Sequence, residues 1–235
     1  MPIKSAIQRI INKDIKELSK LNLDKLGIFV EFDENNMLKA KAIIIGPKNS
    51  PYENGILYFV IEFPTDYPYL PPKIHYLSNS RIRIHPNLYV GRSKDNYLGK
   101  VCLSVINTWS GPQWTTIMHI GSILLSIQSL LSNNPIQYEP GFEKETGIEN
   151  ENYNKIVTYD TFQNLIYHNY LNIPKDFECF NKVIIDHINS NKEDIQHKLK
   201  KLSEINSTIF KISCKIYNIS IIINYPSLLK IFKKI

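Results

Sequence analysis

The stretch LKAKAIIIGPKNSPYENGILYFVIEF, residues 38–63, decides the fold. Its two ends, residues 38–45 and 56–63, are rich in β-branched and aromatic residues, which favour β-strands. The segment between them is rich in glycine, proline, asparagine and serine, the residues that form turns. Because this connection is too short for a parallel crossover, the two strands are predicted to run antiparallel.

Strand-like sequence continues on both sides of this stretch. Residues 26–32 precede it across the turn Asp33-Glu34-Asn35-Asn36, and residues 73–77 follow it. Residues 63–72 are rich in proline, which lacks the N–H donor that a central ladder needs. The sequence therefore predicts a four-stranded antiparallel sheet with a rigid proline segment before its last strand.

Apolar residues at helical spacing predict helices on both sides of the strands. The N-terminal stripe consists of Ile7, Ile10, Ile11, Ile15 and Leu18. A second helix, residues 115–131, carries the stripe Ile117, Ile120, Leu124, Ile127 and Leu131. Thr115 or Thr116 is expected to cap its start.

The sequence changes character after Pro140-Gly141, where strand signals become few. Residues 151–171, 177–189 and 192–205 have helical periodicity, while the chain from Ser207 is ambiguous. We therefore expect an α+β fold with a core domain at residues 1–150 and a C-terminal helical extension, residues 151–235, packed on it.

Composition limits the compartment and the partners. The chain has 235 residues, is 43% hydrophobic and carries a net charge of +6, which describes a globular protein with a mildly basic surface. Three scattered cysteines favour neither a disulfide framework nor a zinc site, so a reducing compartment, cytoplasm or nucleus, is expected. No signal peptide or membrane span is recognisable, and no arginine-rich motif favours nucleic acid.

The chemistry is expected around Ile84-His85-Pro86-Asn87 and Gly99-Lys100-Val101-Cys102-Leu103-Ser104. A thiol can form a covalent acyl intermediate, and an asparagine amide can donate to the oxyanion that forms when that intermediate is attacked. Composition alone favours Cys102 as a small buried hydrophobic residue, which free cysteines often are. Asn87 can likewise be an ordinary turn residue that caps its own backbone.

An ordered set of motifs resembles the ubiquitin-conjugating (E2) enzymes, from about residue 7 to residue 135. The set comprises Gly46-Pro47, Ser50-Pro51-Tyr52, Phe63-Pro64-Thr65-Asp66-Tyr67-Pro68, Pro71-Pro72-Lys73, His85-Pro86-Asn87, Cys102 and Trp114. Further segments resemble the extended Z-type members of that family. These segments are Gly99 to Ser104, Thr108-Trp109-Ser110-Gly111-Pro112-Gln113-Trp114, and Glu139-Pro140-Gly141-Phe142-Glu143.

The resemblance implies that Cys102 receives ubiquitin, or a ubiquitin-like modifier, from an activating enzyme (E1) as a thioester. The acyl group then passes to a lysine of a protein substrate or to a ligase (E3), with RING-type ligases as expected partners. Asn87 would stabilise the oxyanion or support the active-site loop, and His85 would hold the turn by hydrogen bonding. No cofactor or metal is implied.

Two features depart from the family pattern. Cys102 lies fifteen residues after Asn87, a longer separation than is usual, and the additional residues fall within 90–98. The gate loop after the second helix reads Pro135-Ile136-Gln137-Tyr138-Glu139-Pro140, without the aspartate that many members use to orient the incoming lysine. Glu139 is therefore the candidate acidic helper, and a solvated loop charge is the alternative.

The resemblance also implies three docking surfaces. The activating enzyme would meet the basic face of the first helix, the ligase would meet the proline segment and the loop after Trp114, and donor ubiquitin would meet the second helix. The corresponding residues are Arg9, Lys13 and Lys16; Phe63 and Thr116; and Ser122, Leu125 and Ser129.

Three other functions compete with this interpretation. The first is a non-catalytic ubiquitin-binding adaptor on the same fold. The second is a cysteine hydrolase with His85 or His119 as base, for which the sequence offers no separate base–carboxylate pair. The third is a basic nucleic-acid-binding module, whose binding would depend on salt.

Overall fold

The computed structural model describes residues 2–91 and 98–233. Contacts divide the chain into two compact units. The first contains Met1–Ile45, Leu57–Arg81 and Asn87–Leu130, and the second contains Gly46–Ile56, Ile82–Pro86 and Leu131–Ile235. This division differs from the domain boundary expected after residue 150, which stays a prediction.

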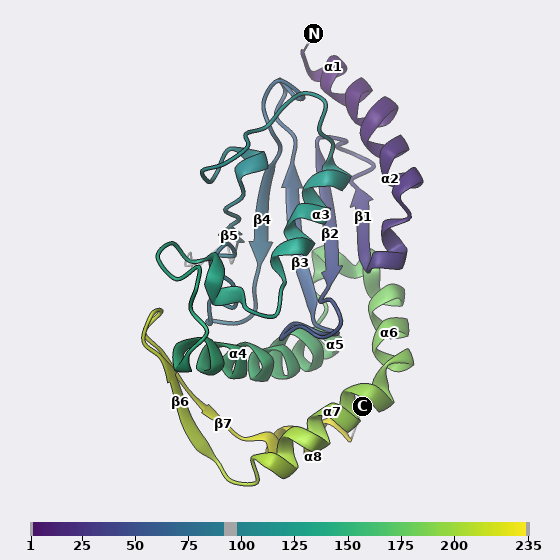
Figure 1. The fold of residues 1–235 in the computed structure, drawn as a ribbon. Helices are drawn as coiled ribbons and strands as arrows, with labels where there is room; N and C mark the ends of the chain where they lie inside the picture. Colours follow the sequence, from purple (N-terminus) through teal and green to yellow (C-terminus); the bar gives the residue numbers. More distant parts are fainter. Residues whose placement is uncertain (1, 92–97, 234–235) are drawn as a thin grey trace. The chain divides into compact units, whose positions relative to one another are not determined.

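The first unit is built on an antiparallel sheet with the strand order β1-β2-β3-β4-β5 (Figure 1). Its strands are β1 (Ile28–Phe32), β2 (Lys39–Ile45), β3 (Ile56–Glu62), β4 (Lys73–Leu77) and β5 (Leu98–Lys100). The four predicted strands are confirmed, and the proline segment stays outside the ladder as expected. Strand β4 pairs with β3 with Ile74 opposite Ile61, and the buried residues of both strands contribute to the core.

The predicted strand count is wrong, because β5 adds a fifth strand beside β4, with Tyr76 opposite Gly99. Only three residues form β5, which is too short for a recognisable alternation. Gly99 is required there, since a Cβ at this position would lie 1.5 Å from the carbonyl oxygen of Tyr89. The inserted residues expected between 90 and 98 lie largely outside the described part of the chain.

The N-terminal helix is confirmed, and it runs through α1 (Pro2–Arg9), a π-helical turn η1 (Ile10–Asp14) and α2 (Ile15–Leu21). Its buried positions are Ala6, Ile10 and Asp14, whereas Ile11 of the predicted stripe is 45% exposed. The buried face therefore differs from the predicted stripe. It includes Asp14, which an apolar pattern cannot identify, and it excludes Ile11.

Asp14 connects the N-terminal helix to Ile120, the first residue of helix α3 (Ile120–Leu130). Its carboxylate accepts hydrogen bonds from the Tyr67 hydroxyl at 2.7 Å and from the backbone N–H of Ile120 at 2.8 Å. It also forms an ion pair with Arg9 at 3.2 Å, and Arg9 donates to the carbonyl of Met118 at 2.8 Å. A buried carboxylate is tolerated here because three donors surround it.

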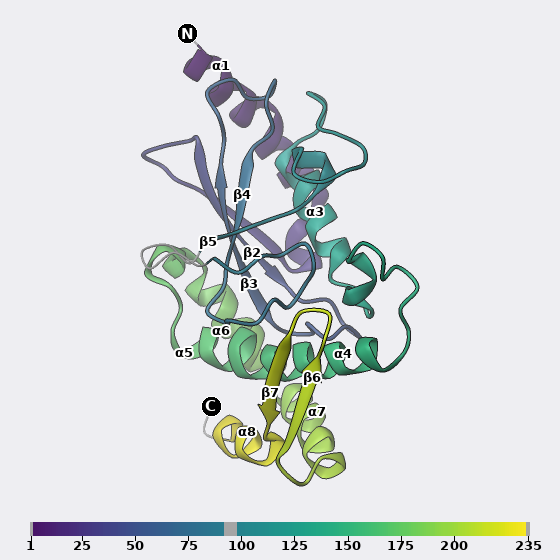
Figure 2. The same cartoon turned by 90° about the vertical axis from the view of Figure 1, so that its left-hand side faces the viewer.

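The helix that crosses one face of the sheet is α3 (Ile120–Leu130), as the two views in Figures 1 and 2 show. It begins later than predicted, because His119 and Ser122 cap it reciprocally. The His119 N–H donates to the Ser122 hydroxyl at 3.3 Å, and the Ser122 N–H donates to His119 Nδ1 at 3.3 Å. The predicted threonine cap is therefore wrong, and Ile117 is 80% exposed instead of joining the core stripe.

The second unit confirms the predicted helices and adds a hairpin. Its helical elements are α4 (Ile148–Asp160), the π-helical η5 (Thr161–His168), α5 (Asn169–Leu171), η6 (Lys175–Phe180), α6 (Asn181–Ser190), α7 (Lys192–Ile205) and α8 (Tyr225–Phe232). The hairpin consists of β6 (Phe210–Cys214) and β7 (Ile219–Ile223), which pair antiparallel (Figure 2). The chain turns between them at Asn218, which adopts φ 51°.

Within residues 2–91 and 98–233, no helix is both long and apolar enough to cross a bilayer, and no cluster of three His, Cys, Asp or Glu side chains offers a metal site. Cys214 is buried and Cys179 is exposed, so of these two cysteines only Cys214 occupies a core position.

Candidate functional site

Asn87 and Cys102 face each other across a short antiparallel bridge, despite the fifteen residues between them. The Cys102 N–H donates to the Asn87 carbonyl at 2.8 Å, and the Asn87 side-chain amide donates to the Cys102 carbonyl at 2.8 Å. The neighbouring pair, Leu88 and Val101, forms the bridge itself. The structure thus brings the predicted amide and thiol residues together, and the Asn87 side chain holds the backbone of Cys102.

Both residues are buried. Cys102 is 2% exposed and Asn87 is 6% exposed. A structural cysteine would have the same low exposure, so the nucleophile assignment depends on the surrounding motif and on chemistry. The bond from Asn87 to the Cys102 carbonyl matches the loop-supporting role that was one of its two predicted functions.

Thr108 fixes the chain on both sides of Cys102, a role that the motif analysis missed. Its hydroxyl donates to the Val101 carbonyl at 2.8 Å and accepts from the Leu103 N–H at 2.9 Å. A threonine five residues after Leu103 gives little sequence signal, because the return depends on the intervening turn η3 (Ser104–Ile106). Thr108 therefore belongs to the candidate site as a backbone clamp.

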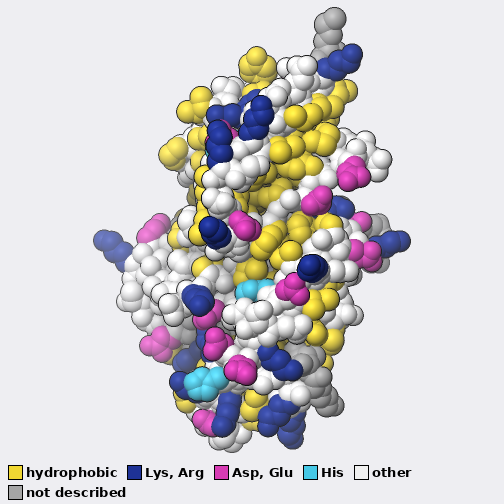
Figure 3. All heavy atoms as spheres, turned by 90° about the vertical axis from the view of Figure 1, so that its right-hand side faces the viewer, with side chains coloured by type: hydrophobic (Ala, Val, Ile, Leu, Met, Phe, Trp, Pro, Cys, Tyr) yellow, Lys and Arg dark blue, Asp and Glu magenta, His cyan; other side chains and the backbone are white. Residues whose placement is uncertain are grey.

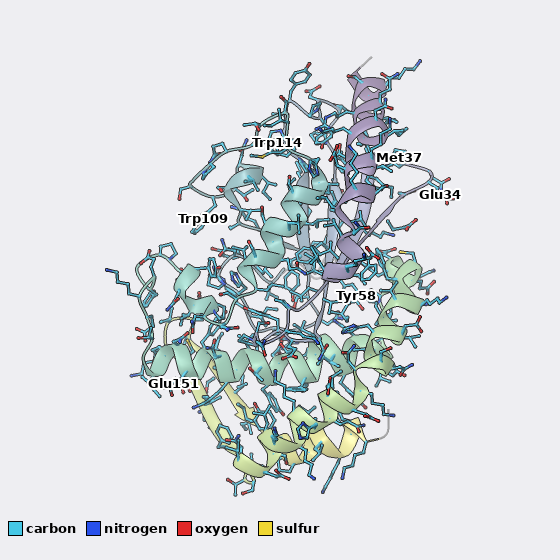
Figure 4. The ribbon with its side chains drawn as sticks, turned by 45° about the vertical axis from the view of Figure 1, so that its right-hand side comes forward. Glu34, Met37, Tyr58, Trp109, Trp114 and Glu151 are labelled. Carbon is cyan, nitrogen blue, oxygen red and sulfur yellow. The ribbon has the colours of Figure 1, made fainter. Side chains whose placement is uncertain are left out.

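The loop after η3 ends in a second polar anchor. Asn107 adopts the left-handed conformation with φ 59°, and its side-chain oxygen accepts from the Trp114 N–H at 2.8 Å. The Trp114 indole donates to the Pro68 carbonyl at 2.7 Å, which ties this loop to the proline segment. Figure 4 shows Trp114 together with Trp109, which is 36% exposed on the same loop.

The turn that precedes Asn87 belongs to the second unit, and side-chain donors occupy its carbonyl groups. The Tyr52 hydroxyl donates to the Ile84 carbonyl at 2.6 Å, and the Tyr153 hydroxyl donates to the Arg83 carbonyl at 2.7 Å. The Arg83 guanidinium donates to the Pro86 carbonyl. Three carbonyl groups of this turn are therefore satisfied by side-chain donors, as backbone groups away from water require.

His85 is completely buried in this turn. Its ring lies 5.1 Å from the ring of Tyr138 and 6.3 Å from that of Tyr52, measured between centroids. This packing suits a residue that supports the turn. His119, the other candidate base of a hydrolase, uses its Nδ1 to cap α3.

Glu139, the candidate acidic helper, is engaged by two neighbours within the second unit. Its carboxylate accepts a hydrogen bond from the Tyr217 hydroxyl at 2.7 Å and lies 3.6 Å from the Arg83 guanidinium. Burial, and secondarily the Glu139 carboxylate, raises the pKa of Tyr217 far above its usual range. Tyr217 was not predicted, because the chain beyond Ser207 was ambiguous; the acidic-helper role of Glu139 stays a prediction.

The predicted docking residues differ in how much surface they offer. Lys13 and Lys16 are exposed. Figure 3 shows the face of the molecule on which α1 and α2 lie, with dark-blue Lys and Arg side chains over it. Arg9 is turned inward instead: its side chain is 15% exposed and pairs with Asp14. Arg9 therefore has a structural role in the N-terminal helix, which sequence periodicity did not indicate.

The remaining docking predictions concern the ligase and donor ubiquitin. Phe63 is 4% exposed and packs its ring 4.9 Å from that of Tyr67, whereas Thr116 is exposed. On α3, Ser129 is exposed, and Ser122 and Leu125 are half-buried. Binding at these positions stays a prediction.

The segment that contains Asn87 and Cys102 is similar to known proteins. The ubiquitin-conjugating enzyme family model matches residues 10–161, which include Asn87 and Cys102. Ubiquitin-conjugating enzyme E2 Z is 41% identical in Homo sapiens and 40% identical in Xenopus tropicalis, each over 140 residues. Those alignments cover 58% of this chain and 38% and 42% of the two relatives.

A plant relative extends the alignment slightly. Putative ubiquitin-conjugating enzyme E2 39 of Arabidopsis thaliana is 40% identical over 161 residues, 65% of this chain and 47% of that protein. The chain thus spans less than half the length of these relatives. Because the family model covers more than half of this chain and includes the paired Asn87 and Cys102, the chain belongs to the ubiquitin-conjugating enzyme family.

Proposed function

We propose that Cys102 carries ubiquitin, or a ubiquitin-like modifier, as a thioester and transfers it to a lysine amine or to a ligase cysteine. The observation that carries this proposal is the reciprocal pairing of Asn87 with Cys102 inside the segment that the family model matches. A thioester keeps the acyl group activated, and its attack by an amine passes through an oxyanion that fixed donors stabilise.

The proposed role of Asn87 is to hold the Cys102 loop through the 2.8 Å bond to the Cys102 carbonyl. The oxyanion role would use the second N–H of the same amide, or would exchange this bond for one to the reacting acyl group. Both roles need the amide donor, and neither an alanine nor an aspartate provides one.

The proposed partners follow from the resemblance, and of the residues concerned Lys13, Lys16, Thr116 and Ser129 are exposed. Lys13 and Lys16 are proposed to contact the activating enzyme, whose encounter rate complementary charge would raise. Leu125 with Ser122 and Ser129 is proposed to receive donor ubiquitin, and Thr116 with Phe63 a RING-type ligase. We place the protein in the cytoplasm or nucleus, because its cysteines suit a reducing compartment.

The test is a charging reaction with an activating enzyme, ATP and ubiquitin, repeated across activating enzymes and modifiers. The protein should acquire one modifier through a bond that dithiothreitol cleaves, and Cys102→Ala should abolish the adduct. Cys102→Ser should give an ester that resists the thiol. Cys179→Ala is the matched control, because Cys179 is exposed and should leave charging intact.

One observation favours a second function, a non-catalytic ubiquitin-binding adaptor: Cys102 is only 2% exposed. An adaptor would bind ubiquitin without ever forming the dithiothreitol-sensitive adduct. Failure to charge with every activating enzyme tried, combined with measurable ubiquitin binding, would establish the adaptor and reject the catalytic proposal.

A further inference from the structure

Three side chains from distant parts of the sequence meet within the second unit. Tyr217 comes from the turn between β6 and β7, Glu139 from the gate loop, and Arg83 from the segment before His85. The Tyr217 hydroxyl donates to Glu139 at 2.7 Å, and the Arg83 guanidinium lies 3.6 Å from the same carboxylate. Arg83 also lies over the Tyr217 ring, 5.0 Å from its centroid.

The charges of these three side chains balance one another, which suits a group that keeps Glu139 in one position. The side chains of Arg83 and Glu139 are 23% and 25% exposed, so they are partly shielded from water. Arg83 balances the charge of Glu139, and the neutral Tyr217 hydroxyl supplies a donor to the same carboxylate. A carboxylate that is occupied by a cation and a hydroxyl is poorly placed to accept a proton from an incoming amine.

The same group is connected to the turn that carries Asn87. Arg83 donates to the Pro86 carbonyl, and Pro86 is joined to Asn87 by a peptide bond. Tyr138, which precedes Glu139, packs its ring against buried His85. The gate loop therefore contacts the turn at two places, through Glu139 with Arg83 and through Tyr138 with His85. Tyr217 supports the first of these contacts, because its hydroxyl donates to Glu139.

We propose that Tyr217 is a positioning residue for transfer to lysine, and that it acts by holding Glu139 and Arg83 in place. The proposal depends on the thioester function of Cys102. In that step the lysine nitrogen bonds to the thioester carbon and the carbon–sulfur bond breaks. The proton lost by the amine ends on the Cys102 sulfur, which returns as a thiol.

The experiment measures discharge of ubiquitin from pre-charged protein to free lysine in a single turnover. Rates are taken on the charged fraction, so they do not depend on how fast each variant charges. Tyr217→Phe removes the hydroxyl and keeps the ring, while Glu139→Gln removes the charge and keeps the shape. Tyr167→Phe is the matched control, because Tyr167 is another half-buried tyrosine of the second unit, packed 5.5 Å from Phe232.

We expect Tyr217→Phe to discharge about fivefold more slowly, the effect of about one hydrogen bond, and Tyr167→Phe to match the wild type. The double variant Tyr217→Phe/Glu139→Gln should be no slower than the slower single variant, because both changes break one contact. Glu139→Gln should lower the rate by the same factor at every pH between 6 and 9, whereas loss of a base would change the profile's shape.

Each other outcome overturns a distinct claim. Tyr217→Phe discharging at the wild-type rate would refute the positioning role, and so would effects that multiply in the double variant. A changed pH profile for Glu139→Gln would make Glu139 the base and refute its role as an anchor. A wild-type protein that never charges would refute the thioester function itself. A melting temperature for each variant identifies unfolding, and Glu139→Gln tests the same contact if Tyr217→Phe does not fold.

Discussion

At the scale of the residue, the candidate site depends on polar side chains that bond to backbone. Asn87 and Thr108 both hold the chain beside Cys102, yet only Asn87 was predicted. The motif around Asn87 identified it, whereas nothing in the sequence near Thr108 indicates that its hydroxyl returns to Val101 and Leu103. Such contacts depend on the geometry of the local turn, and residue patterns in the sequence therefore do not predict them.

Thr108→Val should destabilise the Cys102 loop while nearly keeping the shape of the side chain, because a methyl group replaces the hydroxyl. The substitution leaves the Leu103 N–H without its side-chain acceptor, which costs about 1–3 kcal/mol of unfolding free energy. Urea denaturation measures this loss. Thr115→Val, at an exposed position, should change stability by less than about 0.5 kcal/mol. Equal effects of the two substitutions would refute the clamp.

Cys214 should be far less reactive than Cys179 toward iodoacetamide. Burial, with a smaller contribution from nearby Glu149, raises the pKa of Cys214 to about 11, so its reactive thiolate is scarce at pH 8. Cys179 is exposed. Mass spectrometry of the labelled protein at pH 8 should find Cys179 modified first, with Cys214 reacting appreciably only as the pH approaches 11. Comparable labelling of the two cysteines at pH 8 would contradict the raised pKa of Cys214.

At the scale of the element, the strands were predictable and the starts of elements were less so. Alternation and short connections located β1 to β4 within one or two residues, because those signals are local. The start of α3 was misplaced because His119, an unusual capping residue, forms the cap in place of Thr115 or Thr116. Asp14 was overlooked as a core residue because a charged side chain is normally assigned to the solvent face.

Asp14 should make the attachment of the N-terminal helix to α3 sensitive to pH. Burial raises the pKa of Asp14, although the Tyr67 hydroxyl, the Ile120 N–H and Arg9 lower it. A carboxyl group whose pKa is higher in the folded state than in the unfolded state binds its proton more tightly in the folded state. Its stabilising contribution is therefore complete below the unfolded pKa and is lost as the pH rises through the folded pKa.

The measurement compares melting temperatures of the wild type and Asp14→Asn between pH 3 and pH 8. The stability of the wild type relative to Asp14→Asn should increase as the pH falls through the raised pKa and should level off below the unfolded pKa. Asp24→Asn, at an exposed position, is the control and should show no such trend. A relative stability that decreases toward acid pH would show that the ion pair with Arg9 outweighs burial.

At the scale of the whole molecule, the second unit includes two segments from the first half of the chain. Residues 46–56 are held by the C-terminal helices: Glu53 pairs with Lys198 at 2.8 Å, and Asn54 bonds His187 at 3.1 Å. The Asn169 amide donates to the Ile56 carbonyl at 2.8 Å. Periodicity predicted these helices but not their partners, since contacts across more than a hundred residues leave no local pattern.

Residues 46–56, which lie within the family match, should therefore need the C-terminal helices to stay ordered. A chain truncated after Thr161, where that match ends, loses Asn169, His187 and Lys198 together and uncovers Gly55, which packs against Leu165. We expect amide hydrogens of residues 46–56 to exchange at least tenfold faster in the truncated chain, because their bonding partners are gone. Amides of α3, whose described partners include Asp14 in the first unit, serve as the internal reference. Unchanged protection of residues 46–56 would show that the loop is ordered without the helices, and equal loss of protection in α3 would show that the truncation unfolds the protein generally.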